Sequence, residues 1–406
     1  MPLPRLGAAL LLLVACSGGG DVPGFTRETG PDGREIVSYA AGLPAGEDTL
    51  IPLFTIGKYV DDSSEIFGHL FDVDVSPDRR IYALDVRPTE VMVFDSAGKR
   101  IGTVGRRGEG PGEFSRTNGI HLGPDGTLWV NDNGKRMVLA IDPDGTERVR
   151  VPELTTRTGL AWDVVIDTAG VLWELKNRQV SGGSTMGING LHERELDRQF
   201  FSLDPASGAR DSIAVGPWTA REYGVSFNQG NNQILTELPF RGPELAVMDR
   251  HRRIWVARSD DYTLFRLDIA GDTTLSLNIV EAGLPILPGE LAAWKERWAG
   301  LEPEAPGITA GMMDHMPATK ALVMQLFVDD HERLWVRRVV DQKQSARWDV
   351  FAPDGAFLAT LRGPVEASEA LPAVVRGNRI HVPTNGDAGE RYIVVAELPE
   401  RLRVSR

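Results

Sequence analysis

Apolar and polar residues alternate in short runs along most of this chain, which is the pattern of half-buried β-strands. The clearest stretch runs from Asn118 to Val151. Two turns of the type Pro-Asp-Gly, at 124–126 and 143–145, separate its apolar runs. Pro presets φ, Asp caps the turn and Gly accepts positive φ, so both are predicted to be tight hairpin turns. The stretch therefore predicts a four-stranded meander.

This unit recurs along the chain. Its most recognisable part is the second strand, which has an aromatic or imidazole ring between aliphatic or small neighbours; the central residues are Tyr82, Trp129, Trp173, Trp255, Trp335 and His381. Three of the steps between them are close to the period of about 45 residues that is typical of propeller blades. The other two are roughly 80 residues long, which indicates units with insertions. We therefore expect six units, with the tryptophans buried between neighbouring blades.

The last unit is one strand short. Its third strand is expected at 391–398, after which only 400–406 remain as a C-terminal tail. The segment Leu50–Gly57 has the pattern of a fourth strand followed by Gly, as in Arg100–Gly105. We therefore predict an all-β fold, a six-bladed β-propeller of four-stranded antiparallel blades, in which an N-terminal strand closes the last blade. Ring closure removes exposed sheet edges.

The N-terminus has the features of a targeting segment. Arg5 precedes an apolar run, 6–15, that is too short to span a bilayer, which needs about 20 residues. The run ends in Leu13-Val14-Ala15-Cys16, which resembles the lipobox of bacterial lipoproteins. That resemblance implies cleavage before Cys16 and diacylation of its sulfur. The alternative is an ordinary signal peptide with an incidental Cys.

The expected organisation is a signal peptide at 1–15, a flexible tether at 16–34 and a propeller at 35–399 with insertions at 179–199 and 281–320. Cys16 is the only Cys, so no internal disulfide is possible. The net charge of −13 argues against nucleic acid as a partner. We expect a monomer at the bacterial cell envelope, attached through the lipid on Cys16 to the outer membrane or its periplasmic face.

The two ends of the predicted ring differ. The first and third turns of each blade lie at one end, which we call the tight-turn face. The second turns and the links between blades lie at the other end, and these connections are long and irregular. We call that end the elaborated face, and we expect function there, because binding residues are commonly carried by elaborated loops.

Gly105–Phe114, followed by a strand, a Pro-Asp-Gly turn, Leu-Trp-Val and Asn-Asp, resembles the NHL-type six-bladed propellers. It is also similar to bacterial lipoproteins described as six-bladed propellers. The resemblance covers residues 50–398. It implies the fold, whereas proteins with this fold include binding proteins, lyases and lactonases.

Two sets of residues are candidate sites. Oxygen ligands near the starts of the innermost strands, Asp72, Asn118, Asp163 and Glu244, are expected at the channel mouth. They could hold Ca²⁺, as in gluconolactonase-like and paraoxonase-like propellers, or be polar simply because the mouth is wet. A cationic set on the elaborated face could receive an anionic ligand, or be solvated loop charge; it consists of Arg106, Arg107, Arg116, Lys135 and Arg136.

Two functions therefore remain open. The first is a non-catalytic module that binds a protein or a glycan through the elaborated face. The second is a Ca²⁺-dependent hydrolase or lyase of the lactonase type. Phosphate-binding Gly-rich loops, nucleophile elbows and paired-Cys zinc spacings do not occur in the sequence.

Overall fold

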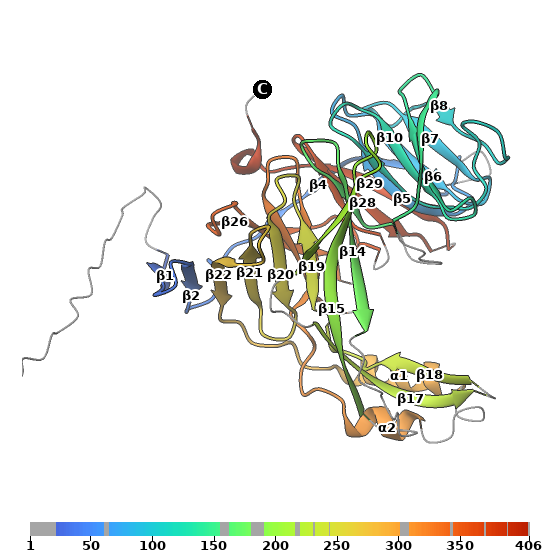
Figure 1. Ribbon diagram of the computed structural model, residues 1–406. Coiled ribbons are helices and arrows are strands. Elements are labelled where there is room, and N and C mark those ends of the chain that lie inside the picture. Colours follow the sequence, from blue (N-terminus) through green and yellow to red (C-terminus); the bar gives the residue numbers. More distant parts are fainter. Residues whose placement is uncertain are drawn as a thin grey trace, which may run out of the picture.

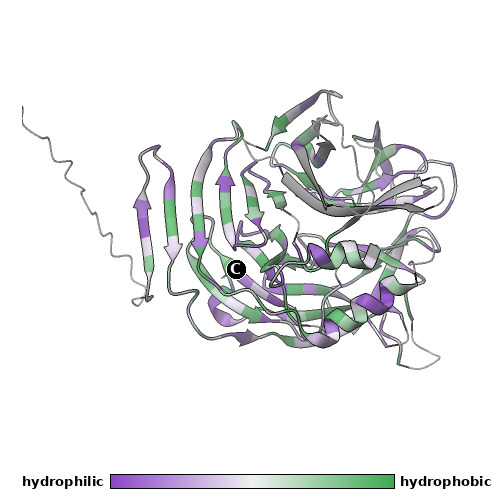
Figure 2. Cartoon of the chain, turned by 90° about the horizontal axis from the view of Figure 1, so that it is seen from below, coloured by the Kyte–Doolittle hydropathy of each residue, from purple (hydrophilic) through white to green (hydrophobic). Residues whose placement is uncertain are grey.

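A computed structural model describes residues 22–60, 65–154, 162–179, 191–215, 220–229, 232–242, 244–300, 308–341, 344–368, 371–387 and 389–404. Six antiparallel four-stranded sheets follow one another along the chain and form the blades of a propeller (Figure 1). Hydrophobic and hydrophilic residues alternate along many of the strands, as Figure 2 shows. The predicted fold class is confirmed.

Each blade runs from an inner strand at the channel to an outer strand at the outside of the propeller. Blades 1 and 2 consist of β5 (Leu70–Val75), β6 (Ile81–Asp85), β7 (Glu90–Phe94) and β8 (Arg100–Val104), then β9 (Thr117–Leu122), β10 (Leu128–Asp132), β11 (Met137–Ile141) and β12 (Glu147–Pro152). Blades 3 and 4 consist of β13 (Val164–Ile166), β14 (Leu172–Gln179), β15 (Leu191–Leu203) and β16 (Arg210–Ala214), then β19 (Leu245–Met248), β20 (Ile254–Arg258), β21 (Thr263–Leu267) and β22 (Thr273–Ile279). Blade 5 consists of β23 (Val323–Val328), β24 (Leu334–Arg338), β25 (Arg347–Phe351) and β26 (Phe357–Arg362).

Blade 6 is closed by an N-terminal strand, as predicted. It consists of β27 (Val374–Arg376), β28 (Arg379–Asn385), β29 (Arg391–Glu397) and β4 (Ile51–Ile56). β4 pairs antiparallel with β29, with Ile56 opposite Ile393. The ring is therefore held together by hydrogen bonds between the two ends of the chain.

The repeated rings of the second strands lie in the cores between blades. Trp255 and Trp335 are at most 1% exposed, and Trp129 and Trp173 are also buried. Trp335 packs in one cluster with Ile380 and Val382 of the next blade. Tyr82 of blade 1 packs with Leu128 and Val130 of blade 2. Burial of large aromatic rings, together with aliphatic side chains, against a neighbouring sheet thus stabilises the stacking of the blades.

The N-terminal segment adds strands outside the blades. β1 (Phe25–Thr29) and β2 (Glu35–Tyr39) form a hairpin, and β2 pairs in parallel with β22, the outermost strand of blade 4. β3 (Asp48–Thr49) pairs with β26 of blade 5. The part of the expected tether that the structure describes therefore contains a strand, and residues 1–21 lie outside the described part of the chain.

Blade 3 extends beyond the ring. β15 continues past β14 to pair with β17 (Ala220–Gln229), which pairs with β18 (Asn232–Glu237). The helices α1 (Pro288–Ala299) and α2 (Ile308–Asp314) lie beside this extension (Figure 1). α1 is anchored by its Glu290, whose carboxylate contacts the buried Lys320 ammonium at 2.9 and 3.0 Å. The chain ends with a 3₁₀ turn, η1 (Glu400–Leu402).

Candidate functional site in the central channel

A cavity of about 1210 Å³ occupies the central channel. Its wall contains residues of all six inner strands, and it continues to the first turns of the blades. Turn residues in the wall include Asp78, Arg79, Thr168 and Arg250. Because the first turns define the tight-turn face, the cavity reaches that end of the channel, and it extends along the inner strands to Asp72 and Asp163.

One ring of residues lies on the inner strands, directly opposite the central residue of each second strand. The strand register defines this ring. From blade 1 to blade 6, the pairs are Asp74 with Tyr82, His121 with Trp129, Val165 with Trp173, Val247 with Trp255, Phe327 with Trp335, and Val374 with His381. All six ring residues line the cavity. We call them the inner ring. Four of its members are apolar and partly exposed, and its two polar members are neighbours on blades 1 and 2.

A second ring lies nearer the tight-turn face. Its members each precede the central second-strand residue by five positions and also line the cavity; they are Pro77, Pro124, Thr168, Arg250, Asp330 and Arg376. We call them the rim ring. The charged members lie on the consecutive blades 4, 5 and 6, so the rim is charged on one half and uncharged on the other.

The two polar members of the inner ring contact each other. Asp74 Oδ2 lies 3.3 Å from His121 Nδ1 and accepts a hydrogen bond from the Leu122 amide at 2.7 Å. Asp74 Oδ1 accepts one from the Val75 amide at 2.7 Å. Burial lowers the pKa of His121, and Arg376 lowers it further, although Asp74 and Asp163 raise it. The lowered pKa favours the neutral ring, and the Asp74 carboxylate beside Nδ1 favours the proton on that nitrogen, which makes Nε2 the acceptor.

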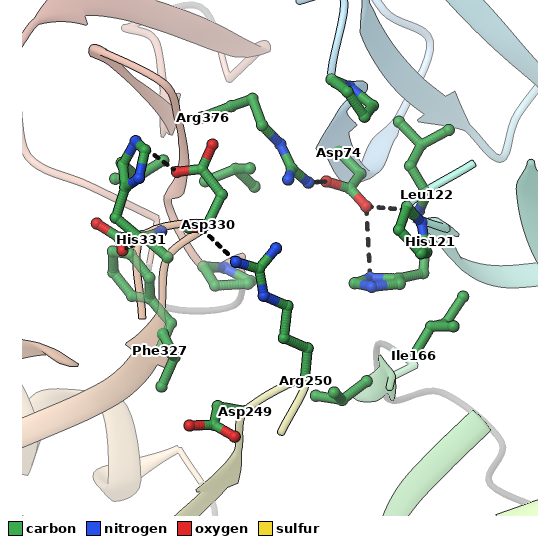
Figure 3. Close-up of a pocket in the computed structure, with 18 of the residues that line it drawn as sticks. Asp74, His121, Leu122, Ile166, Asp249, Arg250, Phe327, Asp330, His331 and Arg376 are labelled. Atoms are coloured by element: carbon green, nitrogen blue, oxygen red, sulfur yellow. Dashed lines mark hydrogen bonds and ion pairs between the residues drawn. The ribbon is translucent and has the colours of Figure 1, made fainter. Parts of the chain in front are cut away.

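Two arginines reach the cavity from blades 4 and 6, on either side of blade 5 (Figure 3). Arg376 Nε donates to the Val75 carbonyl at 2.9 Å, and its Nη2 is 3.9 Å from Asp74 Oδ1. Arg250 Nη2 donates to the Asp330 carbonyl at 2.9 Å and lies 3.8 Å from Glu332. Each guanidinium has five N–H donors, and the described contacts use only part of them. The side chains are 21% and 44% exposed, so they keep donors for a ligand.

Two buried polar atoms between the arginines lack hydrogen-bond partners among the described residues. They are Asp330 Oδ1 and His331 Nε2, which lie 3.7 Å apart. Both side chains line the cavity, on the wall opposite Asp74 and His121 (Figure 3). Both atoms are shielded from the cavity itself, and their 3.7 Å contact is drawn as a dashed line in Figure 3.

The cavity wall contains more carboxylates than guanidiniums, but most of the carboxylates are engaged locally. Asp167, Asp249 and Asp329 are at most 7% exposed, and each accepts two amide hydrogen bonds of its own turn. Asp329 Oδ2 also accepts from Arg333 at 2.6 Å and from the Trp335 indole at 2.8 Å. These acids serve as turn caps. Asp163 and Asp330 also line the cavity, so a ligand meets carboxylates there as well as arginines and imidazoles.

Glu332 is neutralised in a similar way. Its two oxygens contact Arg253 at 2.6 Å and His251 at 2.5 Å. Burial raises the pKa of Glu332, but hydrogen bonding and charge from Arg253 outweigh burial and hold that pKa below its ordinary value. The carboxylate therefore stays ionised and paired, and contributes little net charge to the cavity.

The four oxygen ligands suggested by the sequence are only partly brought together. Asp72 and Asp163 line the same cavity. Both oxygens of Asp72 already accept amide hydrogen bonds, from Val73 at 2.8 Å and Ile120 at 2.9 Å, which join blades 1 and 2. Asn118 is buried on β9, and the Glu244 carbonyl accepts a hydrogen bond from Arg198. Within the described ranges, no three His, Cys, Asp or Glu side chains are grouped as metal ligands. These residues therefore fit a Ca²⁺ ion poorly.

The five cationic residues lie on two neighbouring connections of the elaborated face, as expected. Arg106 contacts Glu113 at 2.8 Å, and Lys135 Nζ donates to the Glu113 carbonyl at 2.8 Å. Arg136 lies 3.9 Å from Glu153. Arg107 and Arg116 are exposed. The role of this cluster as a ligand site stays a prediction.

Cys16 lies outside the described residues, so its lipidation also stays a prediction. Among the helices that the structure describes, none has both the length and the apolar character of a membrane span.

Sequence reasoning missed the residues that line the cavity, although a signal for them was present. Arg250, Asp330 and Arg376 share one position relative to the repeated second-strand residue, and Asp74 and His121 share another. Aligning the six repeats and comparing each column would have placed them in two rings. Single residues in short turns give no such signal.

Comparisons with known proteins agree with the fold. A family profile described as "6-bladed beta-propeller" matches residues 63–157. No curated protein matches the chain significantly. A Bacteroides fragilis protein that is thought to be exported is 12% identical with a TM-score of 0.45, over 90% of this chain and 100% of that chain.

Two further solved structures have similar scores. Regucalcin of Agrobacterium tumefaciens, a calcium-binding protein, is 10% identical with a TM-score of 0.41, over 88% of this chain and 98% of that chain. A gluconolactonase of Xanthomonas campestris is 12% identical with a TM-score of 0.38, over 81% of this chain and 87% of that chain. Such distant similarities assign no ligand or activity. Together, the family profile and the six closed blades identify the chain as a six-bladed β-propeller.

Proposed function

We propose that this protein is an extracytoplasmic binding protein that holds a small anionic molecule in the tight-turn end of its central channel. The observation that carries the proposal is the convergence of Arg250 and Arg376 on one cavity, next to His121 and His331 (Figure 3). Guanidinium groups match the planar geometry of carboxylates and the oxygens of phosphates.

The surroundings support an anion over a cation. The buried acids of the turns are saturated by amides and local arginines, whereas Arg250 has a carboxylate only at 3.8 Å and Arg376 only at 3.9 Å. An anion between the two guanidiniums would thus gain charge-assisted hydrogen bonds without displacing a strong ion pair.

We place the protein at the cell envelope, anchored by a lipid on Cys16. The support is the sequence at 13–16, which resembles a lipobox, and the apolar run before it. Labelling with a radioactive or alkyne-tagged fatty acid tests this part: Cys16→Ser should abolish incorporation. Unchanged incorporation into Cys16→Ser would overturn the anchor.

The binding function can be tested by calorimetry with inorganic phosphate and with simple phosphate monoesters. Saturable binding is expected, and the variants Arg250→Ala and Arg376→Ala should each weaken it about tenfold or more, because a charge-assisted hydrogen bond contributes about 1.5–3 kcal/mol. The double variant Arg106→Ala/Arg107→Ala is the matched control on the elaborated face and should bind normally. Loss of binding in the control alone would place the site on the elaborated face instead.

A Ca²⁺-dependent hydrolase is not supported by these side chains. Asp72 is used in contacts between blades, and the described acids are not grouped around a common point. We therefore derive no reaction step through a metal.

A further inference from the structure

We infer that the anion bound in this channel carries a hydroxyl group, and that His121 Nε2 accepts the hydrogen bond of that hydroxyl. The inference rests on the proposed binding function and specifies the class of its ligand. It comes from the composition of the inner ring, in which one sector alone is polar.

The inner ring has side chains that can hydrogen-bond to a ligand in one sector only. At equivalent positions on blades 3 to 6 the side chains are Val165, Val247, Phe327 and Val374, all partly exposed and all lining the cavity. These side chains offer no hydrogen bond. On blades 1 and 2 the same positions hold Asp74 and His121. A ligand that reaches the inner ring from the rim therefore meets polar side chains in one sector and apolar side chains in the others.

Of the polar atoms in this sector, His121 Nε2 is the one available for a hydrogen bond to a ligand. The carboxylate of Asp74 is 7% exposed and already accepts hydrogen bonds from the Val75 and Leu122 amides, besides its contact with His121. The His121 side chain is 31% exposed. No described residue hydrogen-bonds to its Nε2. The Asp74 carboxylate lies 3.3 Å from Nδ1 and so favours the tautomer with the proton on that nitrogen. In that tautomer Nε2 is an acceptor, and its natural partner is a hydroxyl or another N–H or O–H donor.

His121 lies close to the position proposed for the charged group of the ligand. Arg376 and His121 both contact Asp74, on its two different oxygens, at 3.9 and 3.3 Å. An anion held by Arg376 therefore lies close to the imidazole. A hydroxyl attached one or two carbons from the anionic group can reach Nε2, while the carbon chain between them faces the apolar sector. Hydroxy acids and polyol phosphates have this arrangement.

The test compares ligands with the same charged group. Glycerol 3-phosphate and propyl phosphate have equal charge and equal carbon number and differ in their hydroxyls. Calorimetry at pH 7.5 should show glycerol 3-phosphate binding about three- to tenfold more tightly, because a hydrogen bond contributes a net 0.5–1.5 kcal/mol. Methylation of both hydroxyls should remove the preference. This comparison needs no protein variant.

A variant then assigns the preference to His121. His121→Phe should bind the two phosphates equally, while Arg376→Ala should weaken both and keep their ratio. The ratio should also fall in the wild type as the pH decreases and His121 is protonated, since the charged ring has no acceptor; Asp74, Asp163 and Arg376 are the charged groups that act on it. Equal binding of the two phosphates by the wild type would overturn the inference and leave the binding function intact. Absence of binding by either phosphate, with inorganic phosphate also inactive, would overturn both.

Discussion

The two ends of the channel use the same residue types for different purposes. At the elaborated face, cations lie on long connections and contact neighbouring loop acids and carbonyls, as Arg106 and Lys135 do at Glu113. At the tight-turn face, arginines of short turns line a cavity of about 1210 Å³, and the nearby acids are occupied by turn amides. Loop length is therefore a poor guide to the site in this ring. Convergence of equivalent positions from several blades is a better one.

At both ends of the channel, buried aspartates accept hydrogen bonds from the amides of turns and loops. Asp329 caps a turn at the cavity, and Asp132 accepts amide hydrogen bonds from Ser115, Arg116, Gly134 and Lys135 at the elaborated face. Both are fully buried. Replacing either by Ala should lower the free energy of unfolding by about 3 kcal/mol or more, because several buried donors lose their acceptor.

Only one of these two variants should also change binding. Asp329→Ala releases the turn that carries Asp330 and His331, so phosphate affinity should fall in the folded protein. Asp132→Ala should keep the affinity. Chemical denaturation measures the stabilities and calorimetry the affinities; equal affinities in both variants would contradict the proposed difference between the ends.

The rim arginines give the second prediction. The double variant Arg250→Ala/Arg376→Ala should reduce phosphate affinity by about a hundredfold or more, if each guanidinium contributes about 1.5 kcal/mol or more and the two act independently. Its thermal midpoint without ligand should change little compared with Asp329→Ala, because both side chains are partly exposed. A thermal shift assay with and without phosphate measures both effects. A double variant that phosphate stabilises as strongly as it stabilises the wild type would refute the assignment.

Asp72 gives a smaller, pH-dependent effect. Burial raises its pKa to about 8, against two amide hydrogen bonds that lower it. Between about pH 4 and 8 the folded protein then keeps a proton that the unfolded chain has lost, so stability should decrease as the pH rises through this window. The slope from this group is at most about 1.4 kcal/mol per pH unit. Asp72→Asn should flatten the stability profile measured by denaturation between pH 5 and 8; a profile of unchanged slope would contradict the raised pKa.

The smallest effect is expected from an exposed turn. Asp268 accepts amide hydrogen bonds from Ala270 and Asp272 in a third turn of the tight-turn face, at the solvent. Asp268→Ala should cost about 1 kcal/mol or less, since water can replace the lost acceptor. A loss as large as that of Asp329→Ala, measured by denaturation, would show that burial is not the deciding factor.

Much of the fold was readable from the sequence because it is local and repeated. The second strands around Trp129 and Trp335 and the turns at 124–126 and 143–145 were predicted from patterns within a few residues. Closure of blade 6 was also predicted, since the missing fourth strand had one visible substitute. The β1–β2 hairpin and the extension of blade 3 were missed, because their pairing depends on edges that exist only after the blades form.

The site was harder to predict for the same reason. Arg250 and Arg376 are far apart in the chain, and each is an ordinary exposed residue type in a short turn. Only the closed ring brings them to one cavity. The carboxylates that looked like metal ligands from their position, such as Asp72, turned out to bond to the neighbouring blade, which a single repeat does not reveal.

A crystal of the protein soaked in glycerol 3-phosphate would show whether the channel binds an anion. We expect density for the phosphate between Arg250 and Arg376, with a ligand hydroxyl within hydrogen-bond distance of His121 Nε2. Phosphate density at Arg106, Arg107 or Arg136, with the channel holding only water, would contradict this expectation.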